Sequence, residues 1–248
     1  MQESDTSAKG HLHPLSSLIR EINNIFGKMG FAFSEGPLLE SEHYNFDMLN
    51  FPKDHPARDM QDTFFVKDEP GYVLRTHTSN TQVRYMEGQV KAGILPPYRI
   101  IVPGKVFRNE ATDMTHEMEF YQLEGLMVGE NVSLAHLKGT LEQFFRELFK
   151  GSVEVRLRPS FFPFVEPGAE VDMRITSPDA PEKLRNKWIE IMGAGMIHPN
   201  VIRNAGLDPL KYQGFAFGMG IDRLAILRYE IDDVRLMHSA DLRFINQF

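Results

Sequence analysis

The sequence predicts an α+β fold, a class in which an antiparallel sheet is flanked by helices. Segments with apolar residues at helical spacing lie near the start, in the middle and near the end of the chain. Between them, short strand-like segments follow one another through short turns, as in an antiparallel sheet. The regular alternation of strands and helices that a parallel dinucleotide-binding sheet needs is absent from the sequence.

Composition narrows the class of protein. The 248 residues are 42% hydrophobic and 25% charged, enough to bury a substantial core. No apolar window is long enough for a membrane span or a signal peptide, so neither membrane insertion nor export is predicted and a cytoplasmic location is expected. Zero cysteines exclude thiolate-bound zinc, and the nine histidines show no HxxxH or HExxH spacing, so oxygen ligands are expected for any metal. The net charge of −7 argues against a protein that holds nucleic acid by its overall field.

The first predicted element is a helix over His13 to Met29, where apolar residues recur every three or four positions and Pro14 stands in the tolerated first turn. Phe31 to Glu40 then alternates loosely toward Pro37, whose missing N–H suggests an edge or interface strand. The segment from Ser41 to Val66 is dense in Pro, Asp and His. It is expected to be a structured loop that ends in a short strand.

A second helix is predicted to begin within Thr76 to Glu87, because Thr78 or Ser79 can cap its N-terminus. Arg99 to Val102 is predicted to be a strand that breaks at Pro103-Gly104 and continues into a hairpin. The remaining predicted elements are a helix over Ser133–Phe149 capped by Ser133, strands at Val153–Leu157, Phe161–Met173, Lys187–Met192 and Gly214–Phe217, and a helix over Ile221–Tyr229.

The hairpin VFRNEATDMTHEMEFYQLEG carries the first candidate site. Successive side chains on a strand point to opposite sides. Arg108 and Glu110 therefore share a face of one strand, and Phe120, Gln122 and Glu124 share a face of the other. An arginine suits bidentate contact with phosphate, and a ring can stack on a base. An exposed hairpin face with a salt bridge between Arg108 and a glutamate fits the same pattern.

Two further segments have candidate binding groups. In GFAFGMGIDRLAIL, Gly218 and Gly220 separate a strand from a helix with Arg223 in its first turn, an arrangement that favours an anion. A tight turn with a surface arginine is the alternative. In SFFPFVEPGAE, Phe162 and Phe164 are expected to share one face of a single strand, where they could wall a pocket for an aromatic ring. A doubly buried core strand is the alternative.

Taken in order, these features resemble a known family. A helix and strand ending at Pro37, the strands FRNE and FYQLEG around a loop, and GMGIDR at the start of a helix resemble motifs 1, 2 and 3 of the class II aminoacyl-tRNA synthetases. Longer blocks, among them LRTHTSNTQVRYM, FFPFVEPGAE and GAGMIHPNV, are similar to the catalytic domain of bacterial phenylalanyl-tRNA synthetase alpha subunits. The resemblance extends from about His13 to Phe248.

The resemblance implies an ATP-dependent ligase that uses Mg²⁺. The family joins the carboxylate of phenylalanine to the α-phosphate of ATP, releases pyrophosphate, and transfers phenylalanine to the 2′-hydroxyl of the terminal adenosine of tRNA(Phe). The implied partners are tRNA(Phe) and a beta subunit, in an α2β2 heterotetramer. The alternative is a catalytically silent synthetase-like binding or assembly module, although such modules usually lose the motif arginines, which here are Arg108 and Arg223.

The resemblance also implies roles at the ATP end of the site. Arg108 would contact the α-phosphate and the substrate carboxylate, and Arg223 would clamp the γ-phosphate end of a bent ATP. Glu110 would belong to adenine recognition and Phe120 would stack on adenine. His116, in the loop of motif 2, would approach the outer phosphates.

At the amino-acid end, the resemblance implies that Gln122 and Glu124 bind the ammonium group of phenylalanine, helped by Ser79. Phe162 and Phe164 would contact the phenyl ring. The full implied set is His77, Ser79, Gln82, Gln122, Glu124, Phe162, Phe164, Ala216 and Gly218, of which Ala216 and Gly218 leave space at the end of the pocket.

Several assignments beside the main site are also expected. Glu166 is the candidate metal ligand, with Glu110 as a second carboxylate to test. Gly193 and Gly195 either line the pocket through bare backbone or form a tight turn. His198 is expected to be a structural histidine.

For domain organisation, residues 1–12 are expected to form a flexible tail and residues 13–248 the catalytic domain. The alpha subunits of the family ordinarily begin with a long helical hairpin that reaches the tRNA. The short polar segment before His13 therefore predicts a shortened chain. Its acidic charge suits a domain that builds an adenylate site and depends on a partner to hold tRNA.

Overall fold

The computed structural model of the protein describes residues 10–59, 62–178, 182 and 184–248. Apart from residues 10–12, the predicted N-terminal tail lies outside these described residues. None of the helices within the described ranges has both the length and the hydropathy that a membrane span needs.

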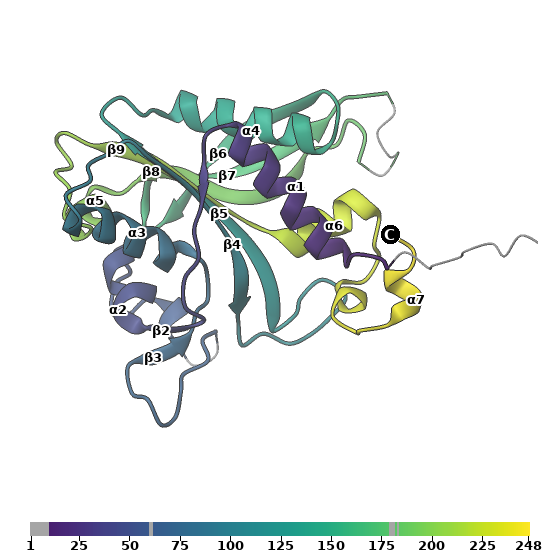
Figure 1. Ribbon diagram of the computed structural model, residues 1–248, viewed down its shortest axis with the longest axis horizontal. Helices are drawn as coiled ribbons and strands as arrows, with labels where there is room; N and C mark the ends of the chain where they lie inside the picture. The colour runs from purple at the N-terminus through teal and green to yellow at the C-terminus, as the bar shows by residue number, and fades with distance from the viewer. Residues whose placement is uncertain (1–9, 60–61, 179–181, 183) are drawn as a thin grey trace, which may run out of the picture.

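A seven-stranded sheet forms the centre of the molecule (Figure 1). Neighbouring strands pair antiparallel except at one edge, where the first strand runs parallel with Ala32 opposite Ile100. The predicted α+β class is confirmed. The parallel pairing of the edge strand was not predicted. In sheet order the strands are β1 (Ala32–Phe33), β4 (Tyr98–Phe107), β5 (Glu119–Gly129), β9 (Gln213–Gly220), β8 (Ile189–Ile197), β7 (Val165–Ile175) and β6 (Val153–Phe162).

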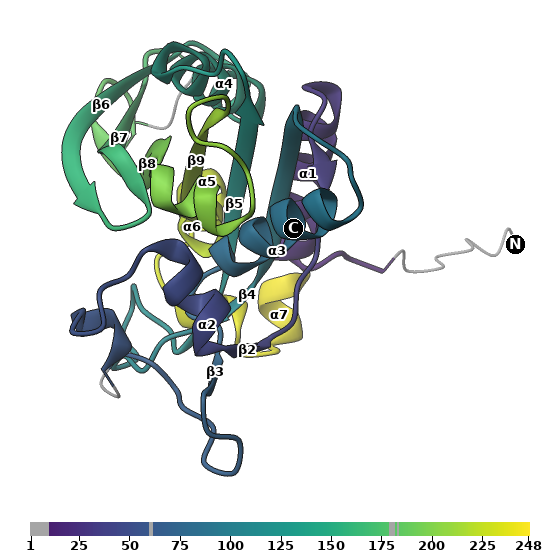
Figure 2. The same cartoon turned by 90° about the vertical axis from the view of Figure 1, so that its left-hand side faces the viewer.

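Helices flank this sheet. A second, two-stranded antiparallel sheet lies beside the short helix α2 (Figure 2). The small sheet pairs β2 (Leu39–Ser41) with β3 (Tyr72–Leu74) and packs on α2 (Glu42–Asn45). The other helices are α1 (Pro14–Lys28), α3 (Ser79–Lys91), α4 (Leu134–Leu148), α5 (Pro199–Asn204), α6 (Ile221–Tyr229) and α7 (Leu242–Ile245), with single 3₁₀ turns η1 (Asp47–Leu49), η2 (Pro56–Arg58) and η3 (Val234–Met237).

Two apolar clusters lie on opposite faces of the large sheet. Ile101 belongs to the cluster that α1, α4 and α6 cover, whereas Ile100 and Val102 belong to the cluster under α3 and α5. Side chains one residue apart on a strand must point to opposite faces, so the sheet is buried on both sides. On the face under α3 and α5, the buried Leu126 is two residues from the buried Glu124, so both side chains point to this face.

The long helices begin and end where local sequence signals place them. The His13 side chain accepts a hydrogen bond from the Leu15 N–H, with Pro14 at the first position of α1. Ser133 caps α4 in a capping box, and α6 has the predicted bounds. The helix α3 continues past the predicted segment to Lys91, and it ends before Gly93, whose φ of +73° only glycine adopts easily.

The predicted break at Pro103-Gly104 is wrong, because β4 runs through it without interruption. Ile101 O accepts from Ser34 N, and Phe107 N donates to Arg75 O, so odd-numbered residues of β4 direct their backbone groups away from β5. The nitrogen of Pro103 lies on the same side, beyond the end of the short strand β1. A missing N–H therefore costs no hydrogen bond in the ladder between β4 and β5.

The prediction that Phe162 and Phe164 share one strand is also wrong. Phe162 is the last residue of β6, and Phe164 lies in the turn before β7 begins at Val165. A run of alternating apolar residues cannot distinguish one strand from two strands joined by a tight turn. The rings still meet, with centroids 5.9 Å apart in a stacked arrangement.

Candidate active site

A cavity of about 550 Å³ opens on the face of the sheet that carries Gln122 and Glu124. Its lining joins polar side chains to a large apolar surface. Eleven of the predicted site residues line it: His77, Ser79, Gln82, Arg108, Glu110, Gln122, Glu124, Phe162, Phe164, Ala216 and Gly218. Its apolar lining includes Leu49, Val83, Met86, Leu126, Ile197 and Val201. The structure therefore brings together groups that the sequence spreads over more than 140 positions.

Strand register sets the floor of the cavity. Gln122 and Glu124 project from β5 on one face, and Gly218 on β9 lies opposite Glu124. A Cβ at position 218 would stand 3.0 Å from Glu124 Cγ, which is tighter than ordinary van der Waals contact. Glycine at this position leaves the glutamate room on the cavity floor.

Glu124 is a buried carboxylate with hydrogen-bond donors around it. Only 5% of the residue is exposed, and its Oε1 and Oε2 accept from Thr78 N and Gln82 Nε2, each at 3.2 Å. Burial raises the pKa of Glu124 to about 7, while the Ser79 hydroxyl and the Thr78 N–H oppose that rise. The carboxyl group therefore titrates near neutral pH.

Gln122, two residues away on the same face, has a free acceptor. Its Oε1 atom is buried and accepts no hydrogen bond from the described residues. A buried polar atom without a partner is costly, and in a cavity it marks a position for a ligand donor. Together with Glu124, it forms a site suited to a group with several N–H donors and a positive charge.

Aromatic rings form a continuous wall of the cavity. Phe164 lies between Phe162, at 5.9 Å, and Phe51, at 5.7 Å, and Phe51 stacks on His77 with centroids 6.0 Å apart. Burial lowers the pKa of His77 to about 3, with Arg108 adding to the effect, so the imidazole is neutral. Gly193 permits this wall, because a Cβ there would be 2.9 Å from the Phe162 ring.

Arg108 extends the site from the end of β4. Its guanidinium carbon lies 5.1 Å from the centroid of Phe120, and its Nε donates to Thr76 O at 3.4 Å. The alternative of a salt bridge between Arg108 and a glutamate is not formed among the described residues. Phe120 does not line the cavity itself, but it stacks under a cation that does.

Arg223 lies outside the cavity lining, at the start of α6. Its Nε and Nη2 donate to the Glu190 carbonyl oxygen at 3.1 and 2.9 Å, and the side chain is exposed. The neighbouring Asp222 is buried and accepts from the Tyr121 N–H at 2.7 Å, so the first turn of α6 is fastened to β5. The helix start is held firmly while the arginine reaches into solvent.

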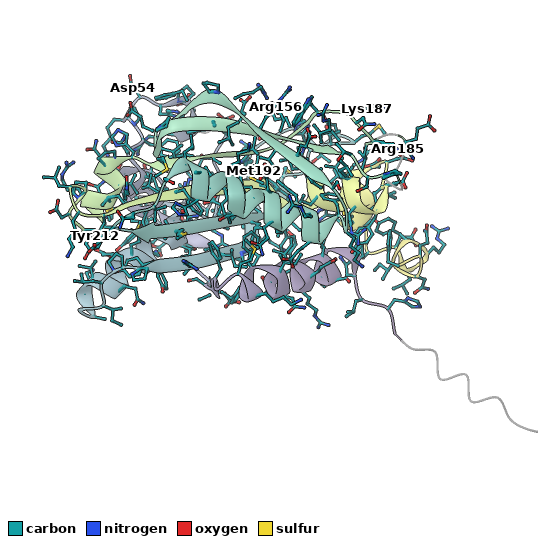
Figure 3. All side chains as sticks on the ribbon, turned by 90° about the horizontal axis from the view of Figure 1, so that it is seen from above. Asp54, Arg156, Arg185, Lys187, Met192 and Tyr212 are labelled. Carbon is teal, nitrogen blue, oxygen red and sulfur yellow. The ribbon has the colours of Figure 1, made fainter. Side chains whose placement is uncertain are left out.

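The surface beyond Glu190 is a network of ion pairs. Arg158 contacts Glu190 and Asp172, and Arg156 contacts Asp172 as well. In Figure 3, Lys187 and Arg185 lie toward one end of the molecule and Asp54 and Tyr212 toward the other, with Arg156 between them. The carboxylates of Glu170 and Glu190 in this network are paired with Arg158.

His116 and Glu166 both lie away from the cavity. The exposed His116 ring is 3.1 Å from Asp113 within the loop between β4 and β5. Glu166 pairs with His198 Nε2 at 3.3 Å, and its side chain is 75% exposed. His198 caps α5 through its Nδ1, which is a structural role as expected. Across the part of the chain that the structure describes, no three acidic or histidine side chains are grouped for a metal.

Sequence reasoning missed several lining residues. Phe51 and His55 come from the Pro-, Asp- and His-rich loop that was expected only to be structured. Thr78 is the N-cap of α3, one of the two predicted caps, but the sequence did not indicate that its N–H also binds Glu124 beneath the cavity. Phe51 has no local signal, whereas the run of hydroxyl and amide residues after Arg75 could have indicated donors for a carboxylate.

Comparison with known proteins gives a consistent result. The family described as "tRNA synthetases class II core domain (F)" matches residues 2–248. The phenylalanine–tRNA ligase alpha subunit of Stenotrophomonas maltophilia is 49% identical over 243 residues, which are 98% of this chain and 70% of that protein. The alpha subunit of Pelodictyon phaeoclathratiforme is 51% identical over 245 residues, covering 96% of this chain and 70% of that protein. The alpha subunit of Clostridium botulinum is 49% identical over 242 residues, covering 96% and 69%.

Proposed function

The chain belongs to the family of class II tRNA synthetase core domains, and from that membership we propose that it joins phenylalanine to tRNA(Phe) at the expense of ATP. The observation that carries the proposal is the cavity floor, where the buried carboxylate of Glu124 and the unpaired Oε1 of Gln122 lie beside an aromatic wall. An ammonium group and a phenyl ring are the two ends of phenylalanine that such a cavity distinguishes.

In the proposed complex, the ammonium group of phenylalanine donates to Glu124 and Gln122. The ring lies against Phe162 and Phe164, which offer edge and face contacts at the separations aromatic pairs prefer. Apolar side chains such as Leu126 and Val201 surround the far end. A tyrosine hydroxyl would be buried there beside no polar partner from these side chains, although an apolar pocket rejects an added hydroxyl by only about 100-fold.

Activation needs no nucleophile from the enzyme. The substrate carboxylate attacks the α-phosphate of ATP, and pyrophosphate leaves, so the protein supplies position and charge. In our proposal Arg108 lies at the junction of the two substrates, where it stabilises the negative charge that develops in the transition state. Phe120 holds adenine, Glu110 recognises it, and His116 and Arg223 approach the outer phosphates.

Arg223 and His116 must move to take these roles. Arg223 is bound to the Glu190 carbonyl and His116 to Asp113, and both side chains are exposed. Replacing a neutral carbonyl by a phosphate as partner strengthens the hydrogen bonds of a guanidinium, which supports a swing toward ATP.

Mg²⁺ is proposed to enter with ATP, as it usually binds through one or two carboxylates together with substrate phosphates and several waters. Glu110 lines the cavity and can supply one such carboxylate, whereas Glu166 is engaged by His198 outside it. When bound, the ion neutralises charge on the phosphates. Of these two carboxylates Glu110 is therefore the better placed for the ion, as an alternative to its proposed role in adenine recognition.

The relatives' name, alpha subunit, implies a beta-subunit partner and tRNA as a substrate. We propose an α2β2 heterotetramer and a cytoplasmic location. The net charge of −7 supports dependence on the partner, because an acidic domain attracts the tRNA backbone weakly. Phenylalanine would be transferred to the 2′-hydroxyl of the terminal adenosine.

The direct test is phenylalanine-dependent exchange of pyrophosphate into ATP, measured with the chain assembled with its beta subunit. Arg108→Ala should reduce exchange by about 100-fold or more, because it removes a charge from the reacting centre. The matched control is Arg243→Ala on α7, whose side chain is 91% exposed, and it should leave exchange unchanged. Exchange with another amino acid in place of phenylalanine would refute the assigned substrate.

A catalytically silent binding module is the competing function. Calorimetry with a non-hydrolysable phenylalanyl-adenylate analogue separates the two, since a silent module should give no binding heat. The ligase should bind the analogue more tightly than phenylalanine or ATP alone, because the analogue makes both sets of contacts at once.

A further inference from the structure

Arg75 is a buried arginine under the proposed amino-group site, and the proposed reaction assigns it no role. It lies between β3 and the start of α3, and only 3% of the residue is exposed. Burying a guanidinium is costly unless hydrogen bonds and nearby negative charge compensate it. The groups around Arg75 therefore indicate which negative charge its guanidinium compensates.

The hydrogen bonds of Arg75 go to neutral carbonyl groups. Its Nε donates to Lys105 O at 2.7 Å, and its Nη1 donates to Gly36 O at 3.2 Å. These bonds fix the position of the guanidinium, but they leave its charge without a directly bound carboxylate. No ion pair within 4.0 Å involves Arg75 among the described residues.

The guanidinium occupies the place of a missing side chain on the cavity side of the sheet. A Cβ at Gly104 would lie 2.3 Å from Arg75 Nη2, so glycine is required for the arginine to fit. Gly104 pairs with Gln122 across β4 and β5, and Glu124 is the diagonal neighbour on the same face. Arg75 thus lies beside both proposed ammonium-binding residues without touching the cavity.

Burial lowers the pKa of Arg75, and the negative charges of Glu124, Glu40 and Glu35 oppose that shift. Glu40 already accepts two hydrogen bonds from Arg84, at 2.6 and 2.8 Å, and Glu35 is exposed to water. Glu124 is the buried one of the three that has no arginine bound to it. Charges in such a buried region are weakly screened by salt, so they act over several ångströms.

We propose that Arg75 is a positioning residue that favours the ionised form of Glu124 and leaves its oxygen atoms available for the ammonium group of the amino acid. This inference rests on the proposed function, in which Glu124 binds that group. Because Lys105 and Gly36 hold the guanidinium in place, Arg75 supplies positive charge without forming a salt bridge to Glu124. A direct salt bridge would occupy the lone pairs that the ammonium needs.

The other groups facing Glu124 do not replace this charge. The segment leading into α3 and its first turn contribute the neutral donors Thr78 N–H, the Ser79 hydroxyl and the Gln82 amide, and the nearby His77 imidazole is also neutral. Arg108 is a second cation, but the α-phosphate and the substrate carboxylate are proposed to bind it. Arg75 does not line the cavity, so no substrate group is proposed to bind it and its charge stays unpaired throughout the reaction.

The test compares Arg75→Gln with Arg75→Lys in the enzyme assembled with its beta subunit. The measured quantity is kcat/KM for phenylalanine in pyrophosphate exchange between pH 6 and 8.5. Arg75→Gln should move the acidic limb of the profile up by about one pH unit or more. Its kcat/KM should therefore fall about tenfold at pH 6.5 and recover at pH 8.5, with KM for ATP unchanged. Arg75→Lys keeps the charge and should keep the wild-type midpoint.

A purely structural role predicts something different. Loss of the bonds to Lys105 and Gly36 would lower activity by the same factor at every pH, and Arg75→Lys would be as defective as Arg75→Gln. Either result overturns the proposal. If the glutamine variant does not assemble, Arg75→Met serves in its place, because it removes the charge and leaves no buried amide unpaired. Failure of the premise is recognised separately, since Glu124→Gln in the wild-type background would then leave KM for phenylalanine unchanged.

Discussion

The two ends of the candidate site differ in how far they are built before any ligand binds. At the proposed amino-acid end, Glu124 is buried and accepts hydrogen bonds from Thr78 and Gln82, and the rings of Phe162 and Phe164 already stack. At the proposed phosphate end, Arg223 and His116 are exposed and bound to other groups.

The difference follows from where each side chain is attached. Glu124 stands in the middle of a sheet, where strand register and burial leave one arrangement. Arg223 projects from a helix start, and His116 from a loop that runs toward the C-terminal segment, where Val234 N donates to Met114 O (Figure 1). We infer that phenylalanine binds to a preformed pocket, whereas the side chains of Arg223 and His116 must move when ATP binds.

Removing Arg223 should produce the largest contrast between the two ends. Arg223→Ala is expected to reduce pyrophosphate exchange by about 100-fold or more and to raise KM for ATP, because a phosphate loses a charged partner. Phenylalanine binding measured by calorimetry without ATP should stay within about twofold of wild type. A large loss of phenylalanine affinity in this variant would mean that the two ends are coupled before ATP binds.

Glu124→Gln should have the opposite selectivity. Losing a charge-assisted hydrogen bond to the ammonium group is expected to lower kcat/KM for phenylalanine by about 10- to 100-fold, while ATP binding alone is unaffected. Glu166→Gln is the matched control, since Glu166 is exposed and paired with His198, and it should change activity less than about twofold. Equal defects in the two variants would contradict the placement of the amino group.

Acid should weaken the amino-acid end more than the phosphate end. The folded protein raises the pKa of Glu124 from its ordinary value of 4.5 to about 7, so the carboxylate predominates only above that pH. Phenylalanine affinity should therefore rise as the pH increases through 7, and it should fall by up to about tenfold per unit below it. Calorimetric titration with phenylalanine at pH 6, 7 and 8 measures this, and a flat profile would show that Glu124 stays ionised throughout.

The smallest effect is expected from crowding the aromatic wall. Gly193→Ala places a Cβ 2.9 Å from the Phe162 ring and should raise KM for phenylalanine by about three- to tenfold, because the preformed pocket cannot yield freely. Gly139→Ala in the exposed part of α4 meets nothing within 4 Å and should stabilise the protein by about 0.5–1 kcal/mol. Thermal unfolding and exchange kinetics of both variants check this pair, and an unchanged KM in Gly193→Ala would show that the wall is compliant.

Much of the fold was predictable because its signals are local. The start of α1 at Pro14, the cap at Ser133 and the bounds of α6 depend on residues within one or two turns. The break assigned to Pro103 failed because the sequence does not say which side of β4 is free of a partner. The single strand assigned to Phe162 and Phe164 failed because a turn between two strands keeps the alternation of apolar residues.

The sequence by itself determined which side chains can share a face. Alternation along the hairpin placed Gln122 with Glu124, and the motif resemblance named a family and a reaction for them. Only the tertiary structure decided the protonation, hydrogen bonding and packing of those side chains. The pKa of Glu124, the unpaired Oε1 of Gln122, the stacking of Phe51 and the placement of Arg75 over Gly104 depend on segments distant in the chain. Burial and electrostatics are set by everything within several ångströms, so a pattern of neighbours along the chain does not contain them.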